Sequence, residues 1–387
     1  MNLNLQNLMR DATRLTRAGQ LSAATEAIQR ALRGDAPGAV AAQPRENRVV
    51  DMLDDNVVDA IDVAELETAA TPSALRARSP NRGEFVRGSH THASLTREYK
   101  LYVPPGPFER RLPLVVMLHG CTQDADDFAA GTGMNALADK QGFVVLYPEQ
   151  AKDANPARCW NWFKHNHQAR ERGETAVIAA MTQVVIRAHG IDPDRVYIAG
   201  LSAGGAMASL VAAAYPDIFA AVGVHSGLAP GAARSLPEGL SAMRGGAGGH
   251  ALPRAMNPGG LATPISPCTT ILSMPAIVFH GDQDQTVHPR NGQQVIDAAL
   301  KRCARPDAAA NGRPVVEQGA SSRGQRYTRS TYGTQTGPAI AEHWLLHGAG
   351  HAWSGGQAAG SYTDARGPDA SGEMLRFFFS HTRRVGH

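Results

Sequence analysis

The chain has 387 residues, 43% of them apolar and 19% charged, which suffices for one large folded domain with an appendage. Its formal net charge of +3 at pH 7 is small and dispersed, so nothing in the composition favours nucleic-acid binding. No stretch approaches the run of about 18 uncharged apolar residues that a membrane span needs. We therefore expect a protein with no membrane span and no nucleic-acid partner.

Residues 1–34 carry apolar side chains at helical spacing on both sides of Gly19, which predicts a short helical leader. Such a hairpin is either a packing appendage or an amphipathic docking element for a partner or a polymer surface. Arg10, Asp11 and Arg14 interrupt what would have to be the apolar core of a secretory signal. This interruption favours a cytoplasmic location, and export by a non-standard route is the alternative.

Residues 35–92 are rich in Ala, Pro, Asp and Arg and poor in aromatic residues, so they are predicted to form a largely irregular linker. His90 and His92 lie close together in this segment. Without further ligands nearby, such a pair is more typical of a loop than of a metal site. The catalytic domain is then expected to occupy residues 93–387.

From Arg97 onward, apolar strands alternate with helices. The expected strands cover 112–120, 142–148, 195–200, 219–227, 275–280 and 341–348, and the expected helices cover 134–140, 175–189, 203–214, 293–301 and 372–380. This alternation predicts an α/β fold with a mostly parallel central sheet and helices on both faces. Residues 229–266 are rich in Gly, Ala and Pro and form an insertion, either a flap over the site or a surface loop.

The strongest chemical signal is the sequence Gly200-Leu201-Ser202-Ala203-Gly204, which matches the pattern G-x-S-x-G. It follows an apolar strand and opens a helix of small residues, the context in which a nucleophilic serine sits on a sharp strand-to-helix turn. Glycine is needed on both sides because the serine backbone is strained and neighbouring chains approach closely. The motif predicts Ser202 as a nucleophile.

A nucleophilic hydroxyl needs a base, and in this type of site the members follow in the order serine, acid, histidine. Two acids, Asp282 and Asp284, follow the strand in IVFHGDQDQTVHP. The spacing favours Asp284 as the acid that orients the base. Asp282 is the alternative, and would otherwise help to hold the loop.

His351 is the favoured base because the preceding residues, 348–350, include two glycines that let the loop turn the imidazole back towards the serine. The rivals are His343 on the strand, His347 at its end and His288 beside the acid. A histidine on a strand is more often a packed core residue.

An oxyanion needs at least two preorganised donors. We expect the backbone N–H of Ala203, directly after the nucleophile, and that of Cys121, in the loop after strand 112–120. His119 shapes this loop, and it is grouped with Trp160 and Trp162 as a candidate substrate-binding residue. The two tryptophans either line an acyl or alcohol pocket or anchor their loop in the core.

The chain has four cysteines and no CxxC pair, so a zinc or redox site has little support. Buried thiols and disulfides are both compatible with Cys121, Cys159, Cys268 and Cys303. A bond between Cys121 and Cys159 would tie the aromatic loop to the oxyanion loop.

Five segments, in order over residues 95–382, resemble the polyhydroxybutyrate (PHB) depolymerase-type esterase family of the α/β-hydrolase superfamily. They are LVVMLHGCTQDADDFAAGTGMNALAD, RCWNWF, VYIAGLSAGGAMASLVAAAYPDIFAAVGVHSG, VFHGDQDQTVHPRNG and GAGHAWSGG. The resemblance implies a triad of Ser202, Asp284 and His351, an oxyanion segment at 119–121, and hydrolysis of carboxylic esters without cofactor or metal.

The resemblance leaves the substrate open between PHB, its oligomers and short-chain acyl esters. The family also includes feruloyl and acetylxylan esterases. Members that attack crystalline polymer carry an export signal and a separate polymer-binding domain, and we recognise neither in this sequence. A serine peptidase and a catalytically silent binding protein are the competing classes.

Overall fold

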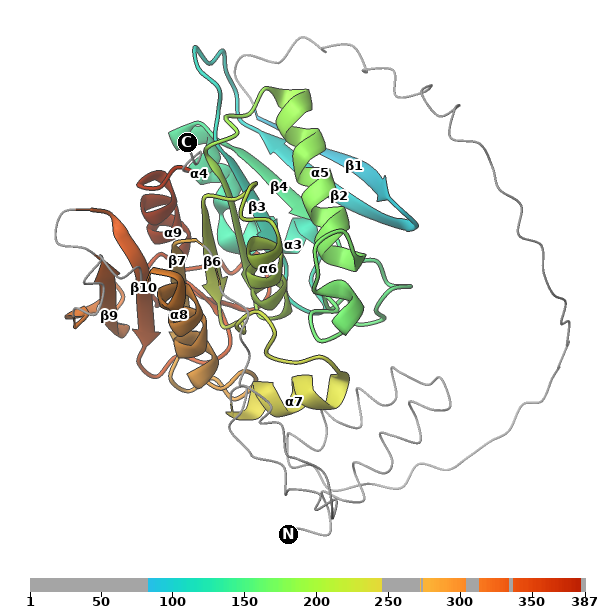
Figure 1. Ribbon diagram of the computed structural model, residues 1–387. Coiled ribbons are helices and arrows are strands. Elements are labelled where there is room, and N and C mark those ends of the chain that lie inside the picture. The colour runs from blue at the N-terminus through green and yellow to red at the C-terminus, as the bar shows by residue number, and fades with distance from the viewer. Residues whose placement is uncertain (1–82, 246–271, 273, 304–312, 334–336, 384–387) are drawn as a thin grey trace, which may run out of the picture. The chain divides into compact units, whose positions relative to one another are not determined.

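The computed structural model describes residues 83–245, 272, 274–303, 313–333 and 337–383 (Figure 1). By its contacts the chain divides into two units, Met1–Arg78 and Ser79–His387, and all the described residues belong to the second. The expected leader 1–34, most of the expected linker and residues 246–266 of the expected insertion lie outside the described residues, as does Cys268.

A ten-stranded sheet in the order β1-β2-β4-β3-β5-β6-β7-β10-β9-β8 forms the centre of the described domain. The strands are β1 (Glu84–His92), β2 (Leu95–Val103), β3 (Leu114–Leu118), β4 (Val144–Pro148), β5 (Val196–Leu201), β6 (Ala221–His225), β7 (Ala276–Gly281), β8 (Val315–Ala320), β9 (Arg326–Gly333) and β10 (Ala339–Leu346). Strands β4, β3, β5, β6, β7 and β10 are mutually parallel, and antiparallel strands flank them at both edges. The predicted mostly parallel sheet is confirmed.

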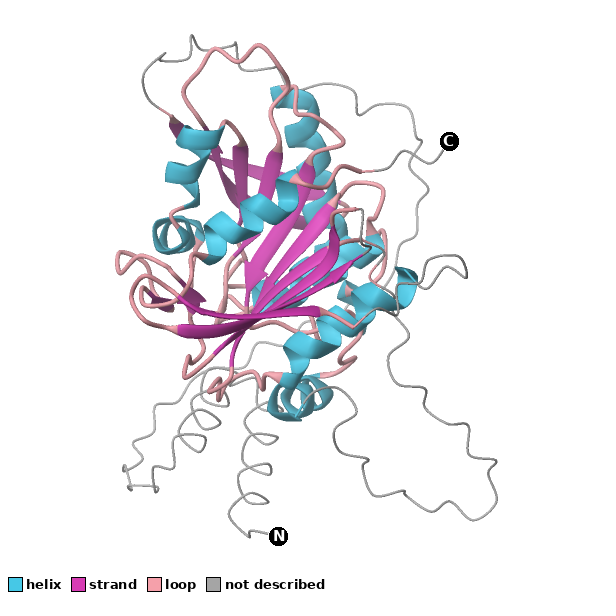
Figure 2. Cartoon of the chain, turned by 90° about the vertical axis from the view of Figure 1, so that its left-hand side faces the viewer, coloured by secondary structure: helices cyan, strands magenta, loops and turns pink. Residues whose placement is uncertain are grey.

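Helices cover both faces of this sheet (Figure 2). They are α3 (Ala125–Thr132), α4 (Met134–Gln141), α5 (Gly173–His189), α6 (Ala203–Ala214), α7 (Leu236–Gly245), α8 (Arg290–Cys303) and α9 (Ala370–Phe379), with a short 3₁₀ turn at His165–His167. A separate two-stranded ladder joins β11 (Trp353–Ser354) to β12 (Thr363–Asp364).

Strand β3 shows how the sequence builds two core layers. Leu114, Val116 and Leu118 pack with apolar residues of α5, α6 and α8 on one face of the sheet. Val115 and Met117 pack with residues of α3, α4 and α9 on the other. Because successive strand residues point to opposite faces, a strand buried on both sides must be apolar throughout.

The expected boundary at residue 93 is corrected by β1, which pairs with β2 from Glu84 to His92. The domain therefore includes at least nine residues that the sequence assigned to the linker. Side chains of β1 are only half-buried or exposed, so the strand lacks the apolar pattern by which strands are recognised. In the expected insertion 229–266, residues 236–245 form α7.

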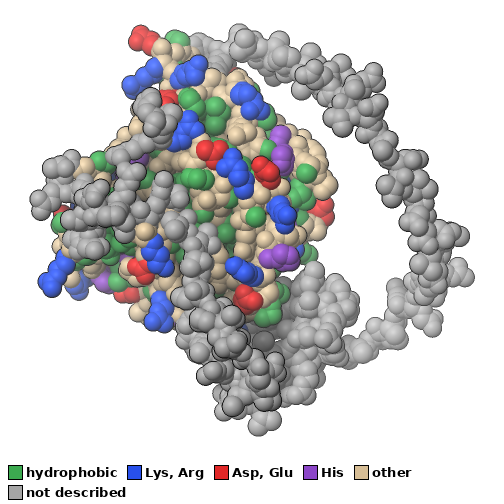
Figure 3. Space-filling model, in the orientation of Figure 1, with side chains coloured by type: hydrophobic (Ala, Val, Ile, Leu, Met, Phe, Trp, Pro, Cys, Tyr) green, Lys and Arg blue, Asp and Glu red, His purple; other side chains and the backbone are tan. Residues whose placement is uncertain are grey.

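Basic and acidic side chains are interspersed over the face of the domain seen in Figure 3. No helix among the described residues is long and apolar enough to traverse a bilayer. Within the same part of the chain, no group of three or more His, Cys, Asp and Glu residues could hold a metal ion.

Candidate active site

Three of the parallel strands bring the predicted triad residues to one edge of the sheet. Ser202 directly follows β5, Asp284 comes three residues after β7, and His351 comes five residues after β10. Carboxyl ends of parallel strands lie on the same edge, so residues far apart in sequence meet there. The N–H of Ser202 donates to the carbonyl of His225 at 2.9 Å, which fixes the serine turn to β6.

Ser202 sits on a strained strand-to-helix turn, with φ 57° and ψ −119°. A positive φ is uncommon for a residue other than glycine and is maintained only by the surrounding structure. A Cβ on Gly204 would lie 2.0 Å from the carbonyl oxygen of Leu118, and one on Gly200 would lie 2.4 Å from the Gly204 carbonyl carbon. Both glycines of the motif are therefore required by close backbone contact.

Asp284 and His351 form a direct hydrogen bond of 2.7 Å from Nδ1 to Oδ2. The other carboxylate oxygen accepts the N–H groups of Thr286 and Val287 at 2.9 and 2.8 Å. Burial alone would raise the pKa of Asp284, but the nearby His280 ring and the hydrogen bonds from His351 and the Val287 N–H hold it well below its usual value. An ionised carboxylate in this position favours the tautomer of His351 that carries its proton on Nδ1.

Among the described residues, no hydrogen bond joins the Ser202 hydroxyl to the His351 ring. In sites without substrate, catalytic hydrogen bonds are often long and shorten when substrate binds. The Ser202 side chain is 9% exposed, so its environment already excludes most water.

The alternative acid and two of the alternative bases have partners of their own. Asp282 accepts from Nδ1 of His347 at 3.0 Å and from the N–H of Gly348 at 2.7 Å. The Nε2 atom of His347 lies 2.8 Å from the Thr328 hydroxyl. Asp282 thus joins the loop after β7 to the loop after β10, as expected of it if it is not the acid. His288 uses Nδ1 to accept the N–H of Arg290.

The two expected oxyanion donors are unpaired in the described structure: neither the N–H of Cys121 nor that of Ala203 has an acceptor among the described residues. The loop that carries Cys121 is fixed on both sides. Gly120 donates to the Gln123 side chain at 3.0 Å, and Thr122 donates to the Ala157 carbonyl at 2.7 Å. Two donors held in place without competing acceptors suit a developing oxyanion.

A disulfide joins Cys121 to Cys159 and links the oxyanion loop to the aromatic loop that carries Trp160. This is the arrangement that the sequence left open for this pair of cysteines. The bond closes a segment 38 residues long between β3 and α5.

The expected substrate-binding roles of His119, Trp160 and Trp162 are corrected to packing. These side chains are 1%, 0% and 5% exposed, so none offers a surface to a ligand. His119 accepts the N–H of Gln150 at Nε2 and donates from Nδ1 to the Gly120 carbonyl at 2.8 Å. Burial lowers its pKa to about 4, so it is neutral and shapes the loop.

The physical reason is that the aromatic loop places its tryptophans in the apolar core, where they belong to the same cluster as residues of α5 and α6. The ring of Trp160 packs 5.6 Å from the ring of His119. Sequence spacing places these aromatic residues near the correct edge of the sheet, but it does not fix the direction in which the loop turns.

Two buried residues that support the site were not assigned a role from sequence. His280 donates from Nε2 to the Val287 carbonyl at 2.7 Å, and the same atom lies 3.5 Å from the Asp284 carboxylate. Glu174 is fully buried and accepts hydrogen bonds from Gln150 and Asn161. The position of His280 directly before Gly281 was the one available signal, while Glu174 lies in a helix without any motif.

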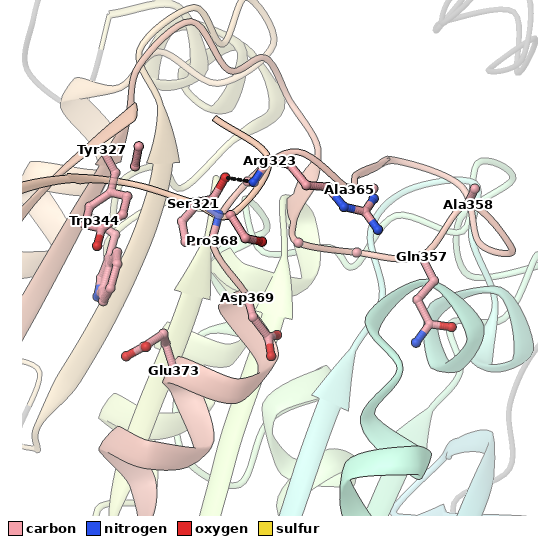
Figure 4. Close-up of a pocket in the computed structure, with 15 residues that line it drawn as sticks. Ser321, Arg323, Tyr327, Trp344, Gln357, Ala358, Ala365, Pro368, Asp369 and Glu373 are labelled. Carbon is pink, nitrogen blue, oxygen red and sulfur yellow. Dashed lines mark hydrogen bonds between the residues drawn. The ribbon is translucent and has the colours of Figure 1, made fainter. Parts of the chain in front are cut away.

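A separate cavity of about 620 Å³ lies between the β8–β9 turn, residues 355–369 and α9 (Figure 4). Its lining includes Arg323, Tyr327, Trp344, Asp369 and Glu373. None of the three triad residues lines it. The candidate site is therefore assigned from the chemistry at the sheet edge and not from the size of a cavity.

A mostly parallel sheet with helices on both faces, and a serine on the turn after β5, define an α/β-hydrolase. Residues 97–318, more than half of the chain, match the family described as Esterase PHB depolymerase. The chain belongs to this family.

The curated relatives of this chain are named for different substrates. The chain is 36% identical to poly(3-hydroxyalkanoate) depolymerase C of Paucimonas lemoignei over 199 residues, covering 51% of this chain and 46% of that protein. It is 29% identical to poly(3-hydroxybutyrate) depolymerase of Ralstonia pickettii over 287 residues, covering 70% and 55%. It is also 29% identical to a probable acetylxylan esterase A of Neosartorya fischeri over 193 residues, covering 49% and 51%.

The chain thus spans about half the length of these curated relatives. Among solved structures, an acetyl xylan esterase from Aspergillus awamori superposes with a TM-score of 0.54 and 20% identity, covering 73% of this chain and 94% of that one. This similarity shows a shared fold.

Proposed function

We propose that this protein is a serine carboxylic-ester hydrolase that acts through an acyl-enzyme. Ser202 is the nucleophile, His351 the general base, and Asp284 the acid that orients it. The N–H groups of Cys121 and Ala203 are the oxyanion donors. The observation that carries the proposal is the 2.7 Å hydrogen bond between Asp284 and His351 at the sheet edge where the strained Ser202 lies.

The chemistry follows from these positions. The Ser202 oxygen attacks the ester carbonyl while Nε2 of His351 takes the hydroxyl proton. The tetrahedral oxyanion accepts the two backbone N–H groups, and Asp284 stabilises the imidazolium that forms. Collapse of this intermediate expels the alcohol, which receives the proton from His351. Water then attacks the acyl-enzyme while Nε2 of His351 takes one of its protons. The Ser202 oxygen leaves with that proton, and the carboxylic acid is released.

For the substrate, we propose poly(3-hydroxybutyrate), its oligomers or short-chain acyl esters, with a polyester surface as the partner. Membership of the family and the names of two relatives support this class. Esters of acetylated xylan or feruloylated polysaccharide are the second candidate, which the acetylxylan esterase relative supports.

The test compares wild type and Ser202→Ala on p-nitrophenyl butyrate, amorphous PHB and acetylated xylan. We expect the substitution to lower kcat by about 10⁴-fold or more, because removal of a triad nucleophile leaves only binding and oxyanion stabilisation. Ser226→Ala is the matched control, because Ser226 directly follows β6 and also has a positive φ of 48°, but it is fully buried, at 0% exposure. It should retain ester hydrolysis.

Near-wild-type turnover by Ser202→Ala would contradict the nucleophile assignment. Wild-type activity on PHB as well as on the small ester would identify a depolymerase. Release of acetate from xylan, with PHB left intact, would move the protein to the second substrate class.

A further inference from the structure

Tyr362 is the one aromatic side chain among the described residues that is largely exposed, at 47%. It lies in the segment between the two strands of the small β11–β12 ladder. Aromatic rings bury much apolar area on contact, so an exposed ring that is held in place is a candidate ligand surface. The contacts of its hydroxyl and of its backbone show where the ring lies relative to the candidate active site.

The Tyr362 hydroxyl is bonded to the oxyanion loop. It lies 3.1 Å from the hydroxyl of Thr122, which directly follows the proposed oxyanion donor Cys121. The single hydroxyl proton of Thr122 is donated to the Cys121 carbonyl at 2.6 Å. Tyr362 is therefore the donor to Thr122, and its hydroxyl is fixed one residue from the oxyanion site.

The backbone of Tyr362 is bonded to the histidine loop. Its carbonyl accepts the N–H of Trp353 at 2.7 Å, and Trp353 is only two residues beyond His351. A reacting carbonyl must lie between the Cys121 N–H and the His351 ring. Tyr362 thus contacts the chain on both sides of that space, one residue from Cys121 and two residues from His351.

Backbone strain at this contact indicates that the position is enforced by its surroundings. Tyr362 has φ 50° and Thr122 has φ 68°, values that bulky and β-branched residues rarely adopt. The adjacent Ser361 donates from its N–H and its hydroxyl to Asp127 at 2.8 and 2.5 Å. Strain of this kind persists where neighbouring contacts over-determine the chain, and it clusters at ligand-binding sites.

We propose that Tyr362 is a specificity-determining residue whose ring packs against the part of the ester chain that extends beyond the scissile group. This inference rests on the proposed ester hydrolysis. A ring fixed through its hydroxyl loses little conformational entropy on binding, so its apolar face favours longer chains over short ones. An ester that is short on both sides gains nothing from it.

The test uses three soluble esters followed by proton release at constant pH: ethyl acetate, ethyl hexanoate and hexyl acetate. The last two extend the acyl side and the alcohol side, respectively. For Tyr362→Ala we expect KM to rise about 10-fold on at least one extended ester, equivalent to about 1.4 kcal/mol of binding, with kcat nearly unchanged. On ethyl acetate, kcat/KM should stay within about twofold of wild type, since no contact is lost there.

Tyr362→Phe keeps the ring and removes the hydroxyl, so it should retain most of the preference for extended esters. Val316→Ala, at an exposed residue on the edge strand β8, is the control and should leave all three esters unaffected. Thermal unfolding of each variant reports on the fold.

Equal losses on all three esters in Tyr362→Ala would show that the residue supports the oxyanion loop and does not select substrate, and no change on any ester would also overturn the proposal. Failure of the wild type to hydrolyse even ethyl acetate and p-nitrophenyl butyrate would instead contradict the proposed function itself.

Discussion

Asp284 accepts hydrogen bonds from two backbone N–H groups and from His351, and Nε2 of His280 lies 3.5 Å from its carboxylate. These donors outweigh burial and keep the pKa of the carboxyl well below its usual value. A neighbouring pair, Asp282 and His347, also has an Asp–His hydrogen bond, and its histidine contacts the Thr328 hydroxyl. Two Asp–His pairs at one sheet edge make it possible to separate catalytic orientation from loop support.

Asp284→Asn should lower kcat on p-nitrophenyl butyrate by about 10⁴-fold, because an amide cannot hold the required tautomer or stabilise the imidazolium. Asp282→Asn removes a similar bond from a pair that does not face Ser202, so its effect on kcat should be far smaller. Steady-state kinetics of both variants provide the comparison. A larger loss in Asp282→Asn would exchange the roles of the two acids.

The sequence predicts an individual site residue where a backbone motif fixes the position of its side chain, and it does not where such a motif is lacking. Ser202, Asp284 and His351 lie at one edge of the sheet because each follows the end of a parallel strand, and that placement can be predicted from apolar runs and glycines. The sequence left Trp160 and Trp162 open between a pocket and the core, because the direction of the loop depends on tertiary packing, and the structure buries both side chains.

Helix α6 crosses the end of β3 with no room for a side chain at Gly204. Helix propensity alone predicts that alanine there would stabilise α6 by about 1 kcal/mol. The added Cβ would instead lie 2.0 Å from the Leu118 carbonyl oxygen, so the helix must move away from the sheet. That movement would displace Ser202 and Ala203 together.

Gly204→Ala should therefore lower the free energy of unfolding by about 3 kcal/mol or more, as overpacking against backbone does. Gly190→Ala is the matched control: Gly190 has φ 60° at the end of α5, and its added Cβ meets no heavy atom within 4 Å. Its cost should be limited to the conformational penalty of about 1–2 kcal/mol. Urea unfolding of both variants measures the difference, and equal costs would contradict the close-contact explanation.

The Cys121–Cys159 disulfide joins the loop after β3 to the loop after β4, and hydrogen bonds also hold the first of these loops. Reduction, or Cys159→Ser, should lower the free energy of unfolding by about 2–4 kcal/mol, the usual range for a closed loop of this size. It should also reduce kcat, because Cys121 carries a proposed oxyanion donor. Unfolding and turnover with and without dithiothreitol measure both effects. Dithiothreitol should have no further effect on Cys159→Ser, and sensitivity there would contradict this explanation.

Not all elements were equally visible in the sequence. The central strands are apolar throughout because helices cover both their faces, so they were predicted close to their observed bounds. Strands β1 and β8 are the two edge strands, and β9 lies between β8 and β10. All three consist mainly of half-buried or exposed residues. Strands of this kind do not bury an apolar face, so their sequences lack the apolar pattern by which strands are recognised.

For the molecule as a whole, the disulfide also bears on the compartment. Disulfides persist mainly in oxidising environments, so this bond stands against the cytoplasmic location that the N-terminal residues favour. Several buried histidines with lowered pKa values also make the stability of the fold sensitive to pH.

His119 directly follows β3, His225 ends β6 and His343 lies in β10, and all three are buried. Burial lowers their pKa values to about 4, about 3 and about 4, respectively. In the unfolded chain each would titrate near 6.5. Between these values the unfolded state binds protons that the folded state excludes, so the stabilising contribution is complete above about pH 6.5 and is lost as the pH falls towards 4. Asp284, whose pKa is also lowered, loses its contribution only below about pH 4.

The free energy of unfolding should therefore fall between pH 7 and pH 5, with a slope approaching about 1.4 kcal/mol per pH unit for each buried histidine. His343→Leu tests one contribution: Nε2 of His343 has no hydrogen-bond partner in the described structure, so the apolar replacement leaves no buried acceptor unpaired. Urea unfolding followed by tryptophan fluorescence at pH 5, 6, 7 and 8 gives the slope for wild type and variant. Between pH 5 and 6 the slope for the variant should be lower by about 1.4 kcal/mol per pH unit, which corresponds to one proton. An unchanged slope would show that His343 is protonated within the fold.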